Sequence, residues 1–107
     1  MNKNQVQVAP VVSVVNNQAI TTSKDVAALF EKRHDNVIRD IKDLIKKVPV
    51  DFAAANFEEN KIKVLCGVGE EITHYNLTRD GFTVLSFGYT GKKAMQFKLA
   101  YIEAFNL

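Results

Sequence analysis

Cysteine, proline and tryptophan are scarce in this chain of 107 residues, which has one cysteine, two prolines and no tryptophan. Because Cys66 stands alone, no internal disulfide can form, and a structural zinc site would lack its usual cysteine ligands. The apolar segment at residues 11–15 is far too short for a signal-peptide core or a membrane span. We therefore expect a cytoplasmic protein that does not bind membranes.

An excess of one sign of charge is also missing, since 14 Lys and Arg residues against 12 Asp and Glu residues leave a net charge of +2. That balance alone does not indicate nucleic-acid binding. The cations nevertheless gather in residues 24–48 and 90–107, while acidic residues are in excess in residues 49–89. This distribution predicts a basic face on a nearly neutral body. With 47% hydrophobic residues, we predict one domain at 9–107 after a flexible leader at 1–8.

Motifs for catalysis are absent as well. The only histidines are His34 and His74, and neither they nor Cys66 belongs to a recognised nucleophile motif. The pair Gly91 and Lys92 does not form a nucleotide-binding P-loop, because a glycine five residues earlier and a following Ser or Thr are both missing. We expect no enzyme activity, no cofactor and no metal.

Residues 22–48 are typical of two helices joined by a short turn. Thr22 and Asp25 form a capping box at the start of a first helix, predicted near residues 23–31. The second helix is amphipathic, with Asp35 as its expected N-cap. Its apolar positions fall on one face when successive residues turn by about 100°: Val37, Ile38, Ile41, Leu44, Ile45 and Val48.

The polar face of this second helix has two explanations. Alternating charges are typical of a solvated surface helix, but such a helix start can also enter the major groove of DNA. For DNA, we predict that Arg33, Asn36 and Arg39 read base edges, since Arg suits guanine and Asn suits adenine. The residues expected to hold DNA phosphates are Lys32, His34, Lys46, Lys92 and Lys93.

Two β-hairpins are predicted around this helix pair. The first joins residues 11–15 to 19–21, because Asn tolerates a tight turn between β-branched segments. The second, at about 61–77, resembles the wing of a winged helix-turn-helix domain. Glu70 and Glu71 near its tip argue against DNA contact there, so a purely structural wing is an equally good hypothesis.

Residues 50–60, between the helix pair and the second hairpin, look irregular, with Phe52 and Phe57 as core anchors. A further helix is predicted from 79 to 87, capped by Thr78 and ended by Gly88. Its inward residues are expected to be Phe82 and Leu85, together with Val84 and Phe87.

The last helix, beginning at Thr90 and ending near residue 106, is apolar over most of its circumference. Phe97, Tyr101 and Phe105 fall on one face. Such a helix is either buried centrally or shared with another protein. These three residues are therefore candidates for a homodimer interface or for a face that binds another protein.

Four stretches resemble a known family: TTSKDVA at 21–27, KRHDNVIRDI at 32–41, TRDGFTVL at 78–85 and GYTGKKAMQFKLAYIEAFN at 88–106. They are similar to the phage regulatory protein Rha family, and the resemblance spans about residues 11–107. It implies a phage- or prophage-encoded regulator in a bacterial cytoplasm that binds double-stranded DNA, with no catalytic residues.

We therefore predict an α+β fold, a small winged helix-turn-helix-like domain with short β-hairpins and about four helices. Its helix-turn-helix unit would cover about 22–48, the hairpin 61–77 and the C-terminal helices 79–106. The predicted function is transcriptional regulation by occupancy of a DNA operator. The alternative is an antirepressor-like module that binds a regulatory protein.

Overall fold

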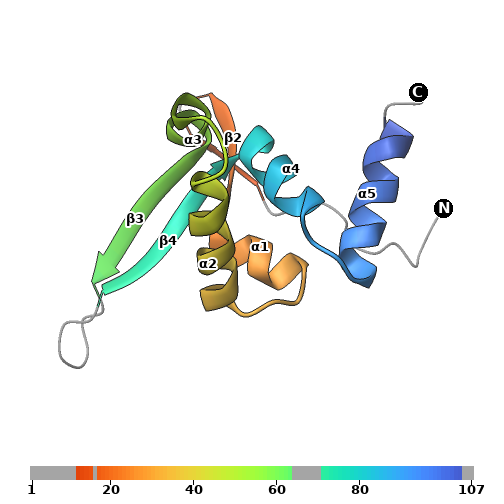
Figure 1. The fold of residues 1–107 in the computed structure, drawn as a ribbon, viewed down its shortest axis with the longest axis horizontal. Helices are drawn as coiled ribbons and strands as arrows, with labels where there is room; N and C mark the ends of the chain where they lie inside the picture. Colours follow the sequence, from red (N-terminus) through yellow and green to blue (C-terminus); the bar gives the residue numbers. More distant parts are fainter. Residues whose placement is uncertain (1–11, 16, 64–70, 105–107) are drawn as a thin grey trace.

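The computed structural model describes residues 12–15, 17–63 and 71–104. The predicted leader and Phe105 lie outside these residues. Within them the chain is α+β, as predicted from the sequence, with five helices and a four-stranded antiparallel sheet (Figure 1). The elements in chain order are β1 (Ser13–Val15), β2 (Gln18–Thr22), α1 (Ser23–Leu29), α2 (His34–Ile45), α3 (Val50–Asn56), β3 (Phe57–Lys63), β4 (Glu71–Thr78), α4 (Arg79–Phe87) and α5 (Lys92–Ala104).

The sheet has the strand order β1-β2-β4-β3, so β4 lies between two strands from different parts of the chain. The hairpin of β1 and β2 forms as expected, with Val15 paired to Gln18. Asn17 between these strands has φ of 63°, a left-handed conformation that Asn adopts more readily than most residues. The two helices α1 and α2 are inserted between β2 and β3.

The second hairpin is longer than predicted. Strand β3 begins at Phe57, four residues before the expected start, and pairs with β4 from Phe57↔Leu77 to Lys63↔Glu71. It extends past the helices on one side of the molecule, while α5 lies at the opposite end (Figure 1). Its length makes it the most protruding described element.

The prediction of irregular structure at residues 50–60 is wrong, because the segment forms α3 and the first four residues of strand β3. Three consecutive alanines favour the helix, and Pro49 as N-cap is compatible with a helix start even though it ends the preceding helix. Asn56 donates a hydrogen bond to the carbonyl of Phe52, closing the last turn. This additional helix raises the number from about four to five within the described residues.

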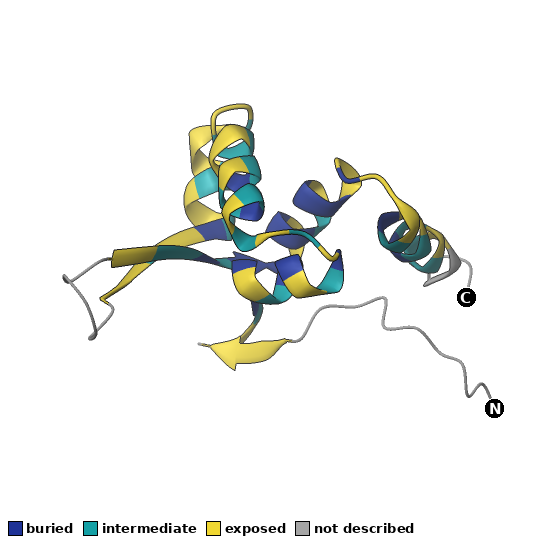
Figure 2. Cartoon of the chain, turned by 90° about the horizontal axis from the view of Figure 1, so that it is seen from below, coloured by how far each residue is buried: buried dark blue, intermediate teal, exposed yellow. Residues whose placement is uncertain are grey.

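A single hydrophobic core joins the sheet to α1, α2, α4 and α5. Figure 2 colours the ribbon as buried where these elements meet and as exposed along the outer part of the long hairpin. Phe57, predicted as a core anchor, is buried, while Phe52 is half-buried against it. The core contains Val26, Ala27, Phe30, Val37, Ile41, Phe57, Tyr75, Leu77, Phe82, Leu85, Tyr89, Ala94 and Phe97.

Helix α4 has the predicted limits, since Thr78 accepts a hydrogen bond from the amide of Gly81 and Gly88 is the C-cap. Phe82 and Leu85 are buried as expected. The inward placement of Val84 is wrong, because its side chain is exposed. Phe87 is also partly exposed, but its ring packs against α5, with ring centres 5.3 Å from Tyr101 and 6.3 Å from Phe97. None of the described helices is long and apolar enough to cross a membrane.

Candidate nucleic-acid interface

The helix pair α1 and α2 is joined by a tight turn. At the start of α1, Thr22 is the N-cap as predicted: its hydroxyl accepts from the amide of Asp25 at 3.1 Å, and the Asp25 carboxylate reaches back to accept from this hydroxyl. After α1, Glu31 adopts φ of 57° and the amide of Lys32 donates to the carbonyl of Ala27 at 2.9 Å. This left-handed turn reverses the chain and presents the beginning of α2 at the surface.

Asp35 is not the N-cap of α2, contrary to the prediction from sequence. The cap is Arg33, which makes no side-chain capping bond, so Asp35 lies inside the first turn. Its carboxylate instead accepts a hydrogen bond from the Arg33 guanidinium at 2.9 Å. The negative charge still lies near the positive end of the helix dipole, which stabilises this end of α2 without a cap.

A buried hydrogen-bond network holds the beginning of α2. The fully buried Ser23 hydroxyl accepts from the amide of Tyr75 on β4 and lies 2.9 Å from Nε2 of His34. Partial burial lowers the pKa of His34, and the nearby Lys24 and His74 lower it further. His34 is predicted from the sequence to hold a DNA phosphate. In the structure its Nε2 atom instead contacts Ser23, and this contact connects α2 with α1 and β4.

The three predicted base-reading residues lie at the N-cap and on the N-terminal half of α2, where Arg33 and Arg39 are exposed and Asn36 is half-buried. Arg39 donates to the Asn36 side-chain oxygen at 3.2 Å and contacts the Asp40 carboxylate at 3.3 Å. The Arg33 side chain, paired with Asp35, is 80% exposed. Because exposed ion pairs of this kind contribute only about 0–1 kcal/mol, an incoming ligand can replace them at little cost.

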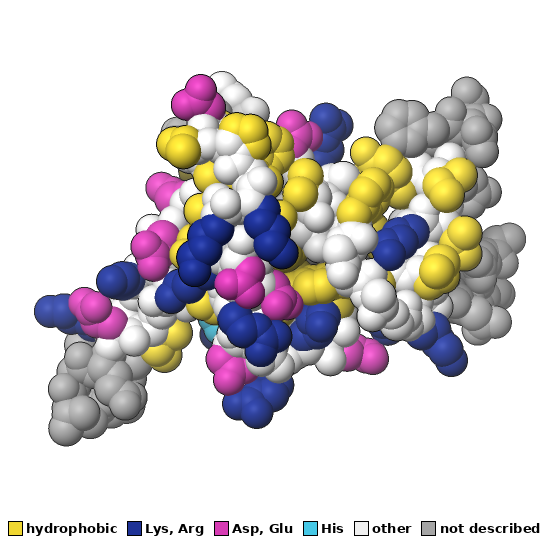
Figure 3. Space-filling view, in the orientation of Figure 1, with side chains coloured by type: hydrophobic (Ala, Val, Ile, Leu, Met, Phe, Trp, Pro, Cys, Tyr) yellow, Lys and Arg dark blue, Asp and Glu magenta, His cyan; other side chains and the backbone are white. Residues whose placement is uncertain are grey.

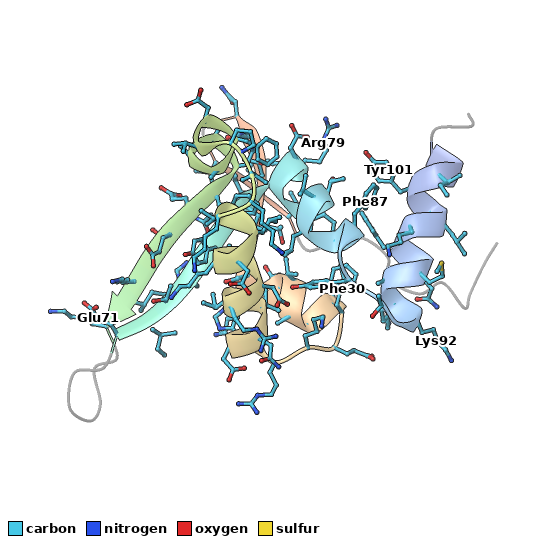
Figure 4. All side chains as sticks on the ribbon, in the orientation of Figure 1. Phe30, Glu71, Arg79, Phe87, Lys92 and Tyr101 are labelled. Carbon is cyan, nitrogen blue, oxygen red and sulfur yellow. The ribbon has the colours of Figure 1, made fainter. Side chains whose placement is uncertain are left out.

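The remaining predicted phosphate contacts fall into separate groups. Lys32 lies beside the start of α2, with Nζ 4.5 Å from the ring centre of Tyr89. Lys46 is exposed just beyond the other end of α2. Lys92 and Lys93 begin α5, and Figure 4 shows Lys92 at a distance from α2. In Figure 3, Lys and Arg side chains surround a few acidic ones over α2.

A polar pocket of about 360 Å³ lies between α2 and the connection from α4 to α5. Cations and carboxylates share its wall, which includes Lys32, Arg39, Asp40 and Lys47. Tyr89 also lines the pocket, and burial raises the pKa of its hydroxyl, with a further rise from the Asp40 carboxylate. This pocket could not be predicted from the sequence, because the residues that line it come from two segments about 40 residues apart along the chain.

The predicted partner face on α5 is mostly turned inward. Phe97 is buried between Phe30 and Phe82, with ring centres at 6.3 and 5.1 Å respectively, and Tyr101 is half-buried. The large apolar side chains that α5 exposes are instead Met95, Leu99 and Ile102. They were not singled out from the sequence, although their spacing of four and three residues is typical of one helix face.

Within the described residues, no group of three or more His, Cys, Asp or Glu side chains is arranged to hold a metal ion. Gly91 takes a positive φ of 99° just before α5. The polar groups on α2 are suited to hydrogen bonding and charge recognition.

Comparison with known proteins shows the family to which this chain belongs. Residues 21–107 match the family described as phage regulatory protein Rha. The chain therefore belongs to the Rha family of phage regulatory proteins. It is 42% identical over 88 residues to an uncharacterized protein of Haemophilus influenzae, a match that covers 81% of this chain and 50% of that protein.

A second relative is encoded by Salmonella phage P22, as an uncharacterized 22.8 kDa protein in the gp15-gp3 intergenic region. It is 34% identical over 96 residues, which cover 89% of this chain and 47% of the phage protein. The chain thus spans about half the length of the curated relatives that it matches. No solved structure matches it significantly.

Proposed function

We propose that this domain binds double-stranded DNA and regulates phage transcription by occupying an operator. The observation that carries the proposal is the placement of Asn36 and Arg39 side by side on the outer face of α2, whose inner face is anchored in the core by Val37 and Ile41. A rigid helix with planar hydrogen-bonding groups outside is suited to the major groove.

The topology supports this proposal. Helices α1 and α2 lie between β2 and β3, and β4 returns to pair with both strands. The short helix α3 stands between α2 and β3, and a helix pair that precedes a β-hairpin on one small sheet resembles winged helix-turn-helix domains. In this arrangement α2 is the recognition helix and the β3–β4 hairpin is the wing.

Arg33, Asn36 and Arg39 keep their proposed roles at base edges, where each good bidentate pair contributes about 1–3 kcal/mol of discrimination. Lys32, Lys46, Lys92 and Lys93 are proposed to bind phosphates and to fix the position of the domain on DNA. We leave His34 out of these contacts, because its Nε2 atom lies against Ser23. Its proposed role is to position α2.

The decisive experiment is fluorescence anisotropy with labelled duplex DNA from the neighbourhood of the gene and with scrambled duplex, over a series of salt concentrations. Arg39→Ala should lose the preference for the specific duplex by roughly 5- to 150-fold, the range expected for one base contact. Arg79→Ala is the matched control, since it removes one exposed arginine from α4, far from α2 in Figure 4.

Equal behaviour of Arg39→Ala and Arg79→Ala would reject the assignment of α2 as the base-reading helix. Absence of binding to either duplex at low salt would reject the DNA-binding proposal as a whole, since phosphate contacts bind most tightly there.

The second candidate function is binding of a host or phage regulatory protein, and it is favoured by the exposed Met95, Leu99 and Ile102 on α5. A second copy of the chain is another partner for the same face, which would also suit paired half-sites on DNA. Sedimentation of the parent and of Leu99→Glu distinguishes these proposals. A monomer in both cases would reject the homodimer and leave the heterologous partner to be tested by capture with purified phage and host regulators.

A further inference from the structure

The long hairpin carries cations on one of its two faces. Side chains at directly paired positions of antiparallel strands lie on the same face. One face of this hairpin is shared by the pairs Phe57–Leu77, Glu59–Tyr75, Lys61–Thr73 and Lys63–Glu71. Since Leu77 and Tyr75 are buried in the core together with residues of α1 and α2, this is the face that carries the helices.

The two lysines lie beyond the part of the sheet that the helices cover. Lys61 and Lys63 are exposed, and neither has an ion-pair partner among the residues that the structure describes. Acidic side chains are near the other end of β3, where Glu58 accepts a hydrogen bond from Asn76. The strand therefore changes from acidic beside the core to basic towards its free end.

The hairpin is also long enough for its free end to contact a different part of a ligand from the part that α2 contacts. Seven residues at about 3.3 Å each make β3 roughly 23 Å long. Figure 1 shows the hairpin reaching past the start of α2, and Figure 4 shows Glu71 close to its free end. A ligand long enough to contact both α2 and the end of β3 must itself be extended, as duplex DNA is.

We infer that Lys61 and Lys63 form a second DNA-contact surface that binds backbone phosphates flanking the segment in contact with α2. This inference rests on the proposed DNA-binding function. Phosphates are the fitting partners because two unpaired lysines supply point charges without the planar groups that base edges require. The contact therefore adds affinity and salt dependence, and it adds no preference between sequences.

Glu71 gives the surface an opposing charge. It is paired in register with Lys63, so its carboxylate repels a phosphate that approaches this end of the hairpin. From the sequence, Glu70 and Glu71 argue against DNA contact at the tip, with a purely structural wing as an equally good hypothesis. The register instead separates the two effects: the lysines attract DNA, and Glu71 limits how strongly they do so.

The test measures binding of random-sequence duplex of about 25 base pairs, roughly 85 Å at 3.4 Å per base pair, by fluorescence anisotropy over a salt series. Lys61→Ala and Lys63→Ala should each reduce the salt slope by about 0.9 log units per log unit and weaken binding several-fold at low salt. Arg79→Ala is the control for the loss of one cation elsewhere. Glu71→Gln should have the opposite effect and tighten binding.

The outcomes separate the inference from the function on which it rests. If the parent protein binds no DNA, the proposed function fails and the inference fails with it. If the parent binds, while both lysine variants keep its salt slope or lose no more affinity than Arg79→Ala, the inference alone is overturned. A tighter Glu71→Gln complex, together with a reduced slope in both lysine variants, supports the second surface.

Discussion

Helices α2 and α5 have nearly the same length, 12 and 13 residues, but they use their apolar side chains differently. Helix α2 buries Val37 and Ile41 completely and exposes mainly charged groups. Helix α5 buries Ala94 and Phe97 but leaves large apolar groups exposed on another side. The core of this chain thus covers the apolar face of α2, whereas it covers only part of the apolar surface of α5.

The largest expected effect is the difference in stability between truncating a buried side chain of α2 and truncating an exposed side chain of α5. Ile41→Ala should lower the free energy of unfolding by about 2–5 kcal/mol, because the side chain is fully buried and its removal leaves a cavity. Leu99→Ala, at a position 58% exposed, should change it by no more than about 0.5 kcal/mol. Urea unfolding monitored by circular dichroism measures both.

A loss of more than about 2 kcal/mol in Leu99→Ala would contradict the contrast, since only burial gives aliphatic truncations such a cost. It would mean that the outer face of α5 is covered in solution. Repeating the measurement at several protein concentrations would then tell whether a second copy covers it, because the stability of a dimer depends on concentration.

The next prediction concerns the polar anchor of α2. Ser23→Ala should cost about 1–3 kcal/mol, because it leaves the buried amide of Tyr75 without its hydrogen-bond acceptor and frees His34. Thermal unfolding measures the loss. Ser23→Thr, which keeps the hydroxyl but adds a methyl group, separates the hydrogen bond from packing. Equal stability of Ser23→Ala and the parent would show that the network does not hold α2.

The corresponding anchor of α5 is expected to matter less. Lys98 donates a hydrogen bond from Nζ to the carbonyl of Tyr89 at 2.8 Å, and its side chain is only half-buried. Lys98→Met should therefore cost about 0.5–1.5 kcal/mol, with the aliphatic stem retained. Hydrogen exchange of the α5 amides gives a local measurement. A larger loss than in Ser23→Ala would reverse the comparison between the two anchors.

Local patterns were sufficient to predict the elements with strong sequence signals. The capping box at Thr22, the cap at Thr78 and the amphipathic period of α2 depend on residues within a few positions of each other. The family resemblance was likewise visible in contiguous stretches and is confirmed over residues 21–107. These features required no knowledge of distant contacts.

Features that depend on distant contacts were missed. Pro49 obscured α3, whose propensity comes from three alanines and whose last residue, Asn56, accepts a hydrogen bond from Thr78 22 positions away. The engagement of His34 by Ser23, and the shared face of Lys61 and Tyr75, follow from tertiary packing and strand register. A one-residue change of register would have moved Lys61 to the other face.

The smallest predicted effect is a pH dependence at the anchor of α2. Ser23 accepts from the Tyr75 amide, so its own proton is free to be donated to Nε2 of neutral His34. Protonation of His34 would place a second donor there. Burial, followed by Lys24 and His74, lowers the pKa of His34 below 6.5, and Asp35 only partly opposes this shift.

The sign of the effect follows from this lowered pKa. As the pH falls, His34 is protonated in the unfolded chain near pH 6.5, before it is protonated in the folded protein. The stability that neutral His34 contributes is therefore fully present above that pH and is lost as the pH falls through the pKa of the folded state. Urea unfolding at pH 7.5 and 5.5 should show a decrease that is smaller in His34→Gln. If His34→Gln keeps the whole decrease, another group titrates. If the decrease depends on His34, the anchor of the proposed recognition helix is itself sensitive to pH, which sets it apart from the Lys98–Tyr89 hydrogen bond that anchors α5.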